Sequence, residues 1–175
     1  MTSFPERLLR AALLQPDVYE EVEADVSAGR QAFAVVLLSS AAVGIGGIAN
    51  SGASGILVQV VCAVVGWWSW AYATYFIGTK LLPTAETEAD PGQLLRTMGF
   101  AGAPGILRIA MLVPVLAFPV WVVGTVWELL AMVVAVRQAL DYSSTLRAIA
   151  VAAIGFPVYA LSLVASVLFL GPWPV

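Results

Sequence analysis

The sequence predicts an all-α polytopic membrane protein with five transmembrane helices and a polar, amphipathic helical arm at the N-terminus. Its 175 residues are 61% hydrophobic and only 11% charged, with a mean hydropathy of +0.92. Soluble domains carry about 25% charged residues. Apolar runs of nearly 20 residues recur along the chain, and that length crosses a hydrocarbon core of about 30 Å. Because these runs do not alternate apolar and polar residues, they are helical spans and not barrel strands.

Residues 1–30 form the predicted cytosolic arm and carry nine charged side chains. Phe4 and Leu8 begin an apolar pattern with helical spacing and interleaved charges, which is typical of an amphipathic helix. Pro16 suits the first turn of a second, acidic helix over Asp17–Ala28. We expect the first helix to pack under the bundle or to lie in the membrane interface. The acidic helix is expected to face solvent or another protein.

Residues 31–175 form the predicted transmembrane domain. Its five spans cover about residues 32–49, 56–78, 97–113, 118–137 and 146–170. Pro104 lies near the start of the third span and Pro157 lies inside the fifth. Because proline removes a backbone donor and clashes with the preceding turn, we expect both residues to distort their helices.

The first predicted span carries small residues at four-residue spacing. Ser40 is followed by Gly44, and Ala42 is followed by Gly46. Small residues four apart lie on one face of a helix and let a neighbouring membrane helix approach closely. We therefore predict helix-packing contacts along this face.

The placement of arginine and lysine predicts the orientation of the chain. With five spans and a cytosolic N-terminus, the cytosolic segments hold Arg7, Arg10, Arg30, Lys80, Arg96, Arg137 and Arg147. The opposite segments, Asn50–Gly55, Pro114–Pro119 and Gly171–Val175, hold no basic residue. The positive-inside rule therefore predicts a cytosolic N-terminus and a C-terminus on the opposite side. The excess of arginine over lysine indicates a GC-rich bacterial genome, and hence a bacterial cytoplasmic (inner) membrane.

Two charged residues, Arg108 and Glu128, lie inside predicted spans. If Pro114–Pro119 is a tight turn, the third and fourth spans form a hairpin folded near residue 118. Each charge is then ten residues from the fold, a helical rise of about 15 Å, which is half the hydrocarbon thickness. We expect the two side chains to meet near the bilayer midplane. Ionisable residues at that depth indicate function by default.

Three interpretations of this pair are open. The favoured one is a structural ion pair that locks the third and fourth spans, because burying either charge alone costs several kcal/mol. The second is a polar site that lines a cavity for a substrate or for protons. The third is that the hairpin is misplaced, so that each charge snorkels or faces another partner.

The residue types exclude most chemistry. The chain has no histidine, and its single cysteine, Cys62, lies inside an apolar run. Histidine-based acid–base catalysis and histidine-ligated metals or haem are therefore excluded. The glycine-rich segment Gly99–Gly105 lacks the Lys-Ser/Thr of a phosphate-binding loop. Glu128 is the only acid in the predicted membrane core, so no catalytic carboxylate pair forms. We expect no enzyme activity, no cofactor and no metal.

A charge cluster formed by Arg137, Asp141 and Arg147 flanks the last predicted cytosolic turn. Arg137 and Asp141 are four residues apart, so they would face each other if the helix continued through them. Charges at this position either set the topology at the membrane edge or form a surface on which a partner docks.

Several short motifs, in order, resemble the Yip family of five-span membrane proteins. Leu14–Tyr19 resembles the Pro-then-aromatic entry to the first span of that family. Leu94–Phe100, followed by Pro104, resembles the approach to its third span. The most typical stretch is Trp127-Glu-Leu-Leu, followed by the polar turn Arg137-Gln-Ala-Leu-Asp-Tyr-Ser143 and by Leu146-Arg-Ala-Ile.

The resemblance implies a five-helix bundle with a cytosolic N-terminus and a non-enzymatic membrane role of the bacterial type. The sequence-based function is accordingly a membrane scaffold or accessory subunit. The expected partners are membrane lipids and other integral membrane proteins, or a second copy in a homo-oligomer, and not nucleic acid. The alternative is a small transporter or permease component that uses Arg108 and Glu128 as a polar intramembrane site.

Overall fold

The computed structural model describes residues 2–170, and this part of the chain is helical with no strand. The helices are α1 (Phe4–Ala12), α2 (Pro16–Ala24), α3 (Ala28–Gly46), α4 (Ile48–Phe76), α5 (Pro91–Phe100), α6 (Pro114–Ala139) and α7 (Thr145–Leu170). A π-helical turn, η1 (Ile77–Leu81), extends α4, and a 3₁₀ helix, η2 (Ala103–Leu112), follows α5. The predicted C-terminal segment Gly171–Val175 lies outside the described residues.

Within residues 2–170, four helices are long and apolar enough to cross a membrane. The qualifying stretches are Ala28–Gly46, Gly52–Leu81, Pro114–Ala139 and Thr145–Ser162. Large apolar side chains on their outer faces are exposed, as a lipid-facing surface requires, and include Val65, Val122 and Leu161. The described part of the chain is therefore all-helical, with four candidate membrane-spanning helices, as in an integral membrane protein.

The predicted third span, residues 97–113, is wrong as a single continuous helix. An α-helix over this region ends at Phe100, and a 3₁₀ helix runs from Ala103 to Leu112. Pro104 has no amide hydrogen to donate, and the glycines around it have low helix propensity, so the α-helix cannot continue. The helix also starts earlier than predicted. Asp90 caps it just before Pro91, and Gln93 in its first turn completes the capping box.

The predicted turn over Pro114–Pro119 is also wrong. The chain reverses at Val113, which has extended backbone angles, and α6 begins at once with Pro114 in its first turn. Proline suits that position because the missing amide has no partner in a helix start anyway. Pro119 lies inside α6. Arg108 and Glu128 are consequently not equidistant from the turn.

The connection between the first two predicted spans contains a short helical segment. α3 ends at Gly46, and α4 begins at Ile48 but has non-helical angles at Gly52, where a kink separates its first turn from the long span Gly52–Leu81. The break therefore falls inside the predicted loop Asn50–Gly55. Gly52 has a φ of 65°, a value that glycine adopts without strain.

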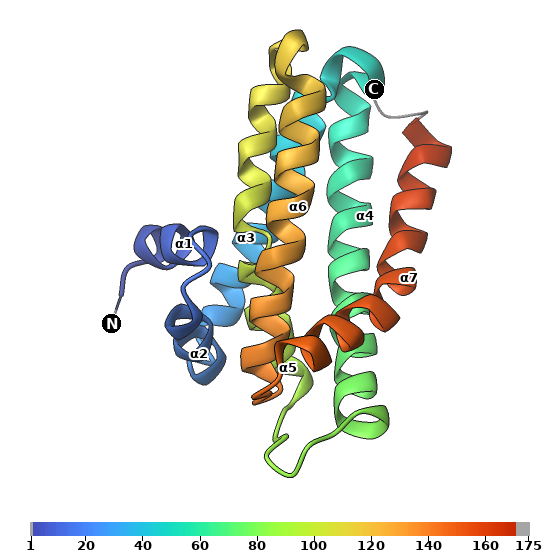
Figure 1. Cartoon of the computed structure of the whole chain (residues 1–175). Coiled ribbons are helices and arrows are strands. Elements are labelled where there is room, and N and C mark those ends of the chain that lie inside the picture. The colour runs from blue at the N-terminus through green and yellow to red at the C-terminus, as the bar shows by residue number, and fades with distance from the viewer. Residues whose placement is uncertain (1, 171–175) are drawn as a thin grey trace.

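The long elements run in alternating directions along one bundle (Figure 1). In that view α5 and η2 follow each other along α6, and α7, which packs against α4, bends partway along its length. Pro157 lies inside α7. The tight turns at Gly47 and Val113 are at one end of the bundle. The connection between η1 and α5 and the turn between α6 and α7 are at the other end.

Helices α1 and α2 pack against the side of the bundle. The indole Nε1 of Trp127 in α6 donates to the carbonyl of Ala12 at 2.7 Å. The guanidinium of Arg96 in α5 donates to the carbonyl of Val22 at 3.0 Å. The carbonyls at the ends of α1 and α2 thus accept hydrogen bonds from bundle side chains, which fixes both helices in place.

A buried arginine joins α1 to α2. Arg7 is only 3% exposed and forms ion pairs with Glu21 at 2.9 Å and Asp25 at 2.8 Å. A hydrogen bond from Thr2, together with the Arg7 guanidinium, lowers the pKa of Glu21. Hydrogen bonds from Ser27 and Arg7 likewise lower the pKa of Asp25, so both carboxylates are charged at neutral pH, as a buried arginine requires.

Candidate functional site

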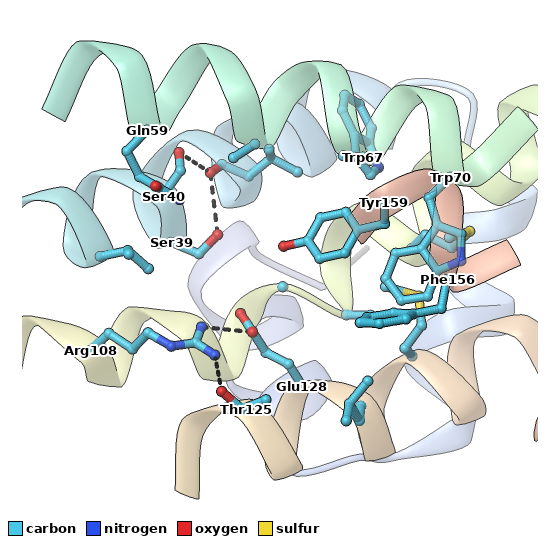
Figure 2. A pocket seen from close by; sticks show the side chains of 18 of the residues that line it. Ser39, Ser40, Gln59, Trp67, Trp70, Arg108, Thr125, Glu128, Phe156 and Tyr159 are labelled. Carbon is cyan, nitrogen blue, oxygen red and sulfur yellow. Dashed lines mark hydrogen bonds and ion pairs between the residues drawn. The ribbon is translucent and has the colours of Figure 1, made fainter. Parts of the chain in front are cut away.

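Arg108 and Glu128 contact each other directly. Nη1 of Arg108 lies 2.6 Å from Oε2 of Glu128 (Figure 2). Nη2 of Arg108 also donates to the hydroxyl of Thr125 at 3.1 Å. The side chains are 9% and 26% exposed, so Arg108 is the more deeply enclosed partner. The pair joins η2 to α6.

The length of the arginine side chain brings the two partners together. Arg108 lies five residues before Val113, a rise of about 10 Å in a 3₁₀ helix. Glu128 lies fifteen residues after Val113, about 22 Å along an α-helix. The extended Arg108 side chain spans most of this offset by running over Gly124, where a Cβ would lie 3.4 Å from Nε and 3.6 Å from Cζ. The prediction that both residues are equally far from the turn is therefore wrong, although their charged groups touch.

Two glycines make room for the pair. A Cβ on Gly105 would overlap Oε1 of Glu128, so the carboxylate is held between Arg108 and the backbone of η2. A Cβ on Gly46 of α3 would overlap the carbonyl oxygen of Arg108. Any side chain at either position would displace the ion pair or separate α3 from η2.

The pair borders a cavity of about 230 Å³ inside the bundle. Helices α3, α4, α5, α6 and α7 and the 3₁₀ helix η2 all contribute to its lining. Its polar lining side chains are Ser39, Ser40, Gln59, Arg108, Thr125, Glu128 and Tyr159. Its other aromatic lining residues are Trp67, Trp70, Trp121 and Phe156. The cavity thus brings polar groups and aromatic rings together between the helices.

The hydroxyl groups at the polar end of the cavity donate to backbone carbonyls of their own helices. Ser39 donates to the carbonyl of Val36 at 3.2 Å, and Ser40 donates to the same oxygen at 2.6 Å. Thr125 donates to the carbonyl of Trp121 at 2.8 Å. Their donors are therefore occupied, and only lone pairs are left for a group inside the cavity.

Gln59 adds a further acceptor. It is 6% exposed, lines the cavity, and its Oε1 has no hydrogen-bond partner within residues 2–170. An unpaired buried oxygen costs about 1–3 kcal/mol, so such groups in native proteins call for an explanation. A bound polar group would satisfy it.

Three rings from two helices form the aromatic end of the cavity. Trp70 of α4 stacks on Tyr159 of α7 with centroids 4.9 Å apart, and it meets Phe156 edge-on at 5.8 Å. Phe156 and Tyr159 are 6.1 Å apart. The Tyr159 hydroxyl points from this cluster toward Glu128 and Ser39 (Figure 2).

The predicted small-residue face of α3 contacts two elements. A Cβ on Gly44 would lie 2.8 Å from the Cα of Ile56, so α3 and α4 approach closely there. Gly46 contacts η2, Ala42 is 4% exposed, and Ser40 lines the cavity. These residues pack inside the protein rather than on its surface.

Arg137 and Asp141 do not face each other as predicted. α6 ends at Ala139, and Asp141 has a φ of 50° in the turn that follows. Arg137 instead donates to the carbonyl of Tyr142 at 3.1 Å. Arg147 donates to the carbonyl of Pro83 at 3.2 Å and lies over the Tyr142 ring. The two arginines thus bind backbone carbonyls around this turn. The Asp141 carboxylate forms no ion pair within the described residues.

Gln59, Tyr159 and the aromatic cluster were not predicted as site residues from the sequence. Gln59 could have been found, because it is an amide side chain within a long apolar run and shares a helical face with Trp67 and Trp70. Tyr159 carried no comparable signal. No group of His, Cys, Asp and Glu side chains in residues 2–170 could hold a metal ion.

No protein-family model, curated protein or solved structure matches this chain. The resemblance to the Yip family therefore stays a prediction.

Proposed function

We propose that this protein binds a small polar solute inside its helical bundle and acts as a carrier or permease component. The observation that carries the proposal is the cavity of about 230 Å³ between apolar spans, with Arg108, Glu128 and the unpaired Gln59 in its wall. Ionisable groups at membrane depth mark solute pathways when they face a cavity. A purely structural role for the ion pair would not account for the adjoining cavity or for the unpaired Oε1 of Gln59.

The break between α5 and η2 supports this role. Ala101 and Gly102 interrupt the helix and line the cavity. Non-helical backbone at membrane depth is tolerated where it is buried in protein or lines a cavity, and interrupted helices form the solute sites of many transporters.

The proposal includes a fifth crossing made of two pieces. Helix α5 rises about 15 Å and η2 about 20 Å, and together they exceed a hydrocarbon core of about 30 Å. The arginine and lysine distribution then orients the N-terminus toward the cytosol of a bacterial inner membrane. In this arrangement α1 and α2 form a helical arm on the cytosolic half of the bundle.

Thiol labelling tests whether polar solutes reach the cavity. In a Cys62→Ala background, Ser39→Cys places a thiol of similar size in the cavity wall. We expect it to react in membranes with a small charged methanethiosulfonate reagent. The matched control is Val65→Cys, which is 57% exposed on the outer face of α4 and should stay unmodified in lipid. A Ser39→Cys thiol as inert as the control would contradict the proposal.

A scaffold or accessory subunit is the second candidate, and the close packing around the ion pair favours it. Gly46 and Gly105 fit Arg108 and Glu128 without spare room, as a structural lock between α3, η2 and α6 requires. This function, in keeping with the resemblance to the Yip family, has no enzymatic step. It predicts an inert Ser39→Cys thiol and a partner protein, or a second copy, that co-purifies in mild detergent.

A further inference from the structure

We propose that the solute is a small organic ammonium ion, held between the Glu128 carboxylate and the rings of Trp70, Phe156 and Tyr159. This inference rests on the proposed function and specifies its substrate class. It follows from three properties of the cavity: the supply of hydrogen-bond acceptors, the grouping of aromatic rings and the small volume.

The polar end of the cavity presents several hydrogen-bond acceptors. The hydroxyls of Ser39, Ser40 and Thr125 all donate to backbone carbonyls, and Gln59 presents an unpaired Oε1. Glu128 contributes a carboxylate with one oxygen on Arg108. Nε1 of Trp70, a buried donor without a hydrogen-bond partner in residues 2–170, belongs to the aromatic end. A ligand that matches the polar end brings donors or positive charge.

Arg108 does not offer a site for an anion. It donates from Nη1 to Glu128 and from Nη2 to Thr125, so an anion at its remaining N–H groups would lie beside the Glu128 carboxylate, which is a like charge. An anionic ligand would either be repelled by that carboxylate or displace it and leave it without a partner. Stranding one half of a buried pair is strongly unfavourable, so the cavity selects against anions.

The aromatic end supplies a second attraction for cations. Ring faces carry negative charge density, and an ammonium within about 6 Å of a ring centroid is attracted to it, most strongly where water is excluded. Trp70, Phe156 and Tyr159 lie within 4.9–6.1 Å of one another, so one small cation can contact more than one ring.

The volume limits the size of the ligand. Pockets for drug-sized molecules measure about 300–1,000 Å³. The cavity here is about 230 Å³, which fits a compact alkylammonium with a short substituent. The charged Arg108 lies on the far side of Glu128 from the rings (Figure 2). It therefore opposes the bound cation across the carboxylate and keeps affinity moderate.

Isosteric probes test the class directly. The purified full chain in lipid nanodiscs is titrated with choline, with its neutral isostere 3,3-dimethylbutan-1-ol and with the anion 3,3-dimethylbutanoate, by calorimetry and tryptophan fluorescence. We expect choline to bind at least about tenfold more tightly than either of the others. Equal binding of the neutral alcohol, or tighter binding of the anion, would overturn the cation assignment.

Variants with opposite expected signs exclude a merely structural explanation. Glu128→Gln should weaken choline binding by about tenfold or more, whereas Arg108→Gln, measured at a pH high enough to keep Glu128 ionised, should strengthen it by a similar factor because the opposing charge is gone. Phe156→Leu leaves the ion pair intact and should weaken choline about tenfold without affecting the alcohol. Glu20→Gln, on the exposed face of α2, is the matched control and should change nothing.

The outcomes separate this inference from the proposed function. If Ser39→Cys reacts with the thiol reagent but choline does not bind, the cavity is open and the ammonium assignment is wrong. If the thiol is inert and no probe binds, both proposals fail. If Arg108→Gln and Glu128→Gln do not fold, Phe156→Leu decides: unchanged choline affinity in that variant overturns the aromatic site.

Discussion

Replacing Arg108 and Glu128 singly and together by methionine should show a large coupling energy, with a larger loss of stability for one single variant than for the other. The two side chains meet at 2.6 Å with 9% and 26% exposure, so each single change leaves a largely enclosed charge without its partner. Breaking a buried pair in this way costs about 3–5 kcal/mol. Glu128→Met should lie at the upper end, because a stranded arginine cannot lose its proton. Arg108→Met should lie at or below the lower end, because a stranded carboxylate can be neutralised by taking one up.

The double variant is expected to be nearly as stable as the parent, because apolar residues of similar volume often replace a buried ion pair at no cost. The coupling energy from the cycle is then at least about 3 kcal/mol. Unfolding by SDS in mixed micelles, followed by helicity and tryptophan fluorescence, measures all four proteins. The same cycle on Arg10 and Asp17, a pair with an aspartate 67% exposed, is the control and should give about 0–1 kcal/mol. A double variant as unstable as the sum of the single changes would refute a direct interaction.

Three further predictions concern other contacts. Gly105→Ala should destabilise the fold by about 1–3 kcal/mol in the same SDS titration, because its Cβ would overlap Glu128, and unchanged stability would show that the approach is looser than described. Burial, with the nearby charge of Asp141, raises the pKa of Glu23 to about 7, so the folded protein holds a proton that the unfolded chain releases near pH 4.5. Stability should therefore fall between pH 4.5 and 7 by at most about 3 kcal/mol, and Glu23→Gln should flatten this part of the thermal-unfolding profile. Trp127→Phe removes the indole hydrogen bond to the end of α1 and should increase hydrogen exchange in α1 but not in α4. Equal exchange of α1 in the variant and in the parent protein would contradict docking through this bond.

The class of fold could be predicted from the sequence because hydropathy is a local property. Apolar runs near 20 residues require helices in a membrane, and four of the five predicted spans are long apolar helices in the structure. The remaining one, the third predicted span around Pro104, is apolar in composition, but proline and glycine break its helix. A distortion was predicted there from Pro104. The change to a 3₁₀ helix was not, because it depends on how closely α3 and α6 pack against this segment.

Helix boundaries next to proline could not be predicted from the sequence. Pro114 fits both a turn and the first residue of a helix, and the sequence alone does not distinguish the two. The structure has it starting α6, so the reversal falls at Val113. Arg108 and Glu128 were expected to meet because they seemed equally deep. They meet instead because an extended arginine runs over Gly124, a relation between two elements that no local pattern contains.

The cavity could not be predicted, because six elements line it. Gln59 and Tyr159 lie a hundred residues apart and line the same cavity only because α4 packs against α7. A helical-face comparison would have grouped Gln59 with Trp67 and Trp70 on α4. It could not have shown that this face borders Glu128.

The most direct test of the account is the rate at which Ser39→Cys, in the Cys62→Ala background, is modified in membranes with and without choline. The account predicts faster modification by a trimethylammonium-bearing methanethiosulfonate than by the sulfonate-bearing one, and protection by choline but not by 3,3-dimethylbutan-1-ol. A thiol that neither reagent modifies would contradict an accessible polar cavity. Modification that choline does not slow would contradict an ammonium site beside Glu128.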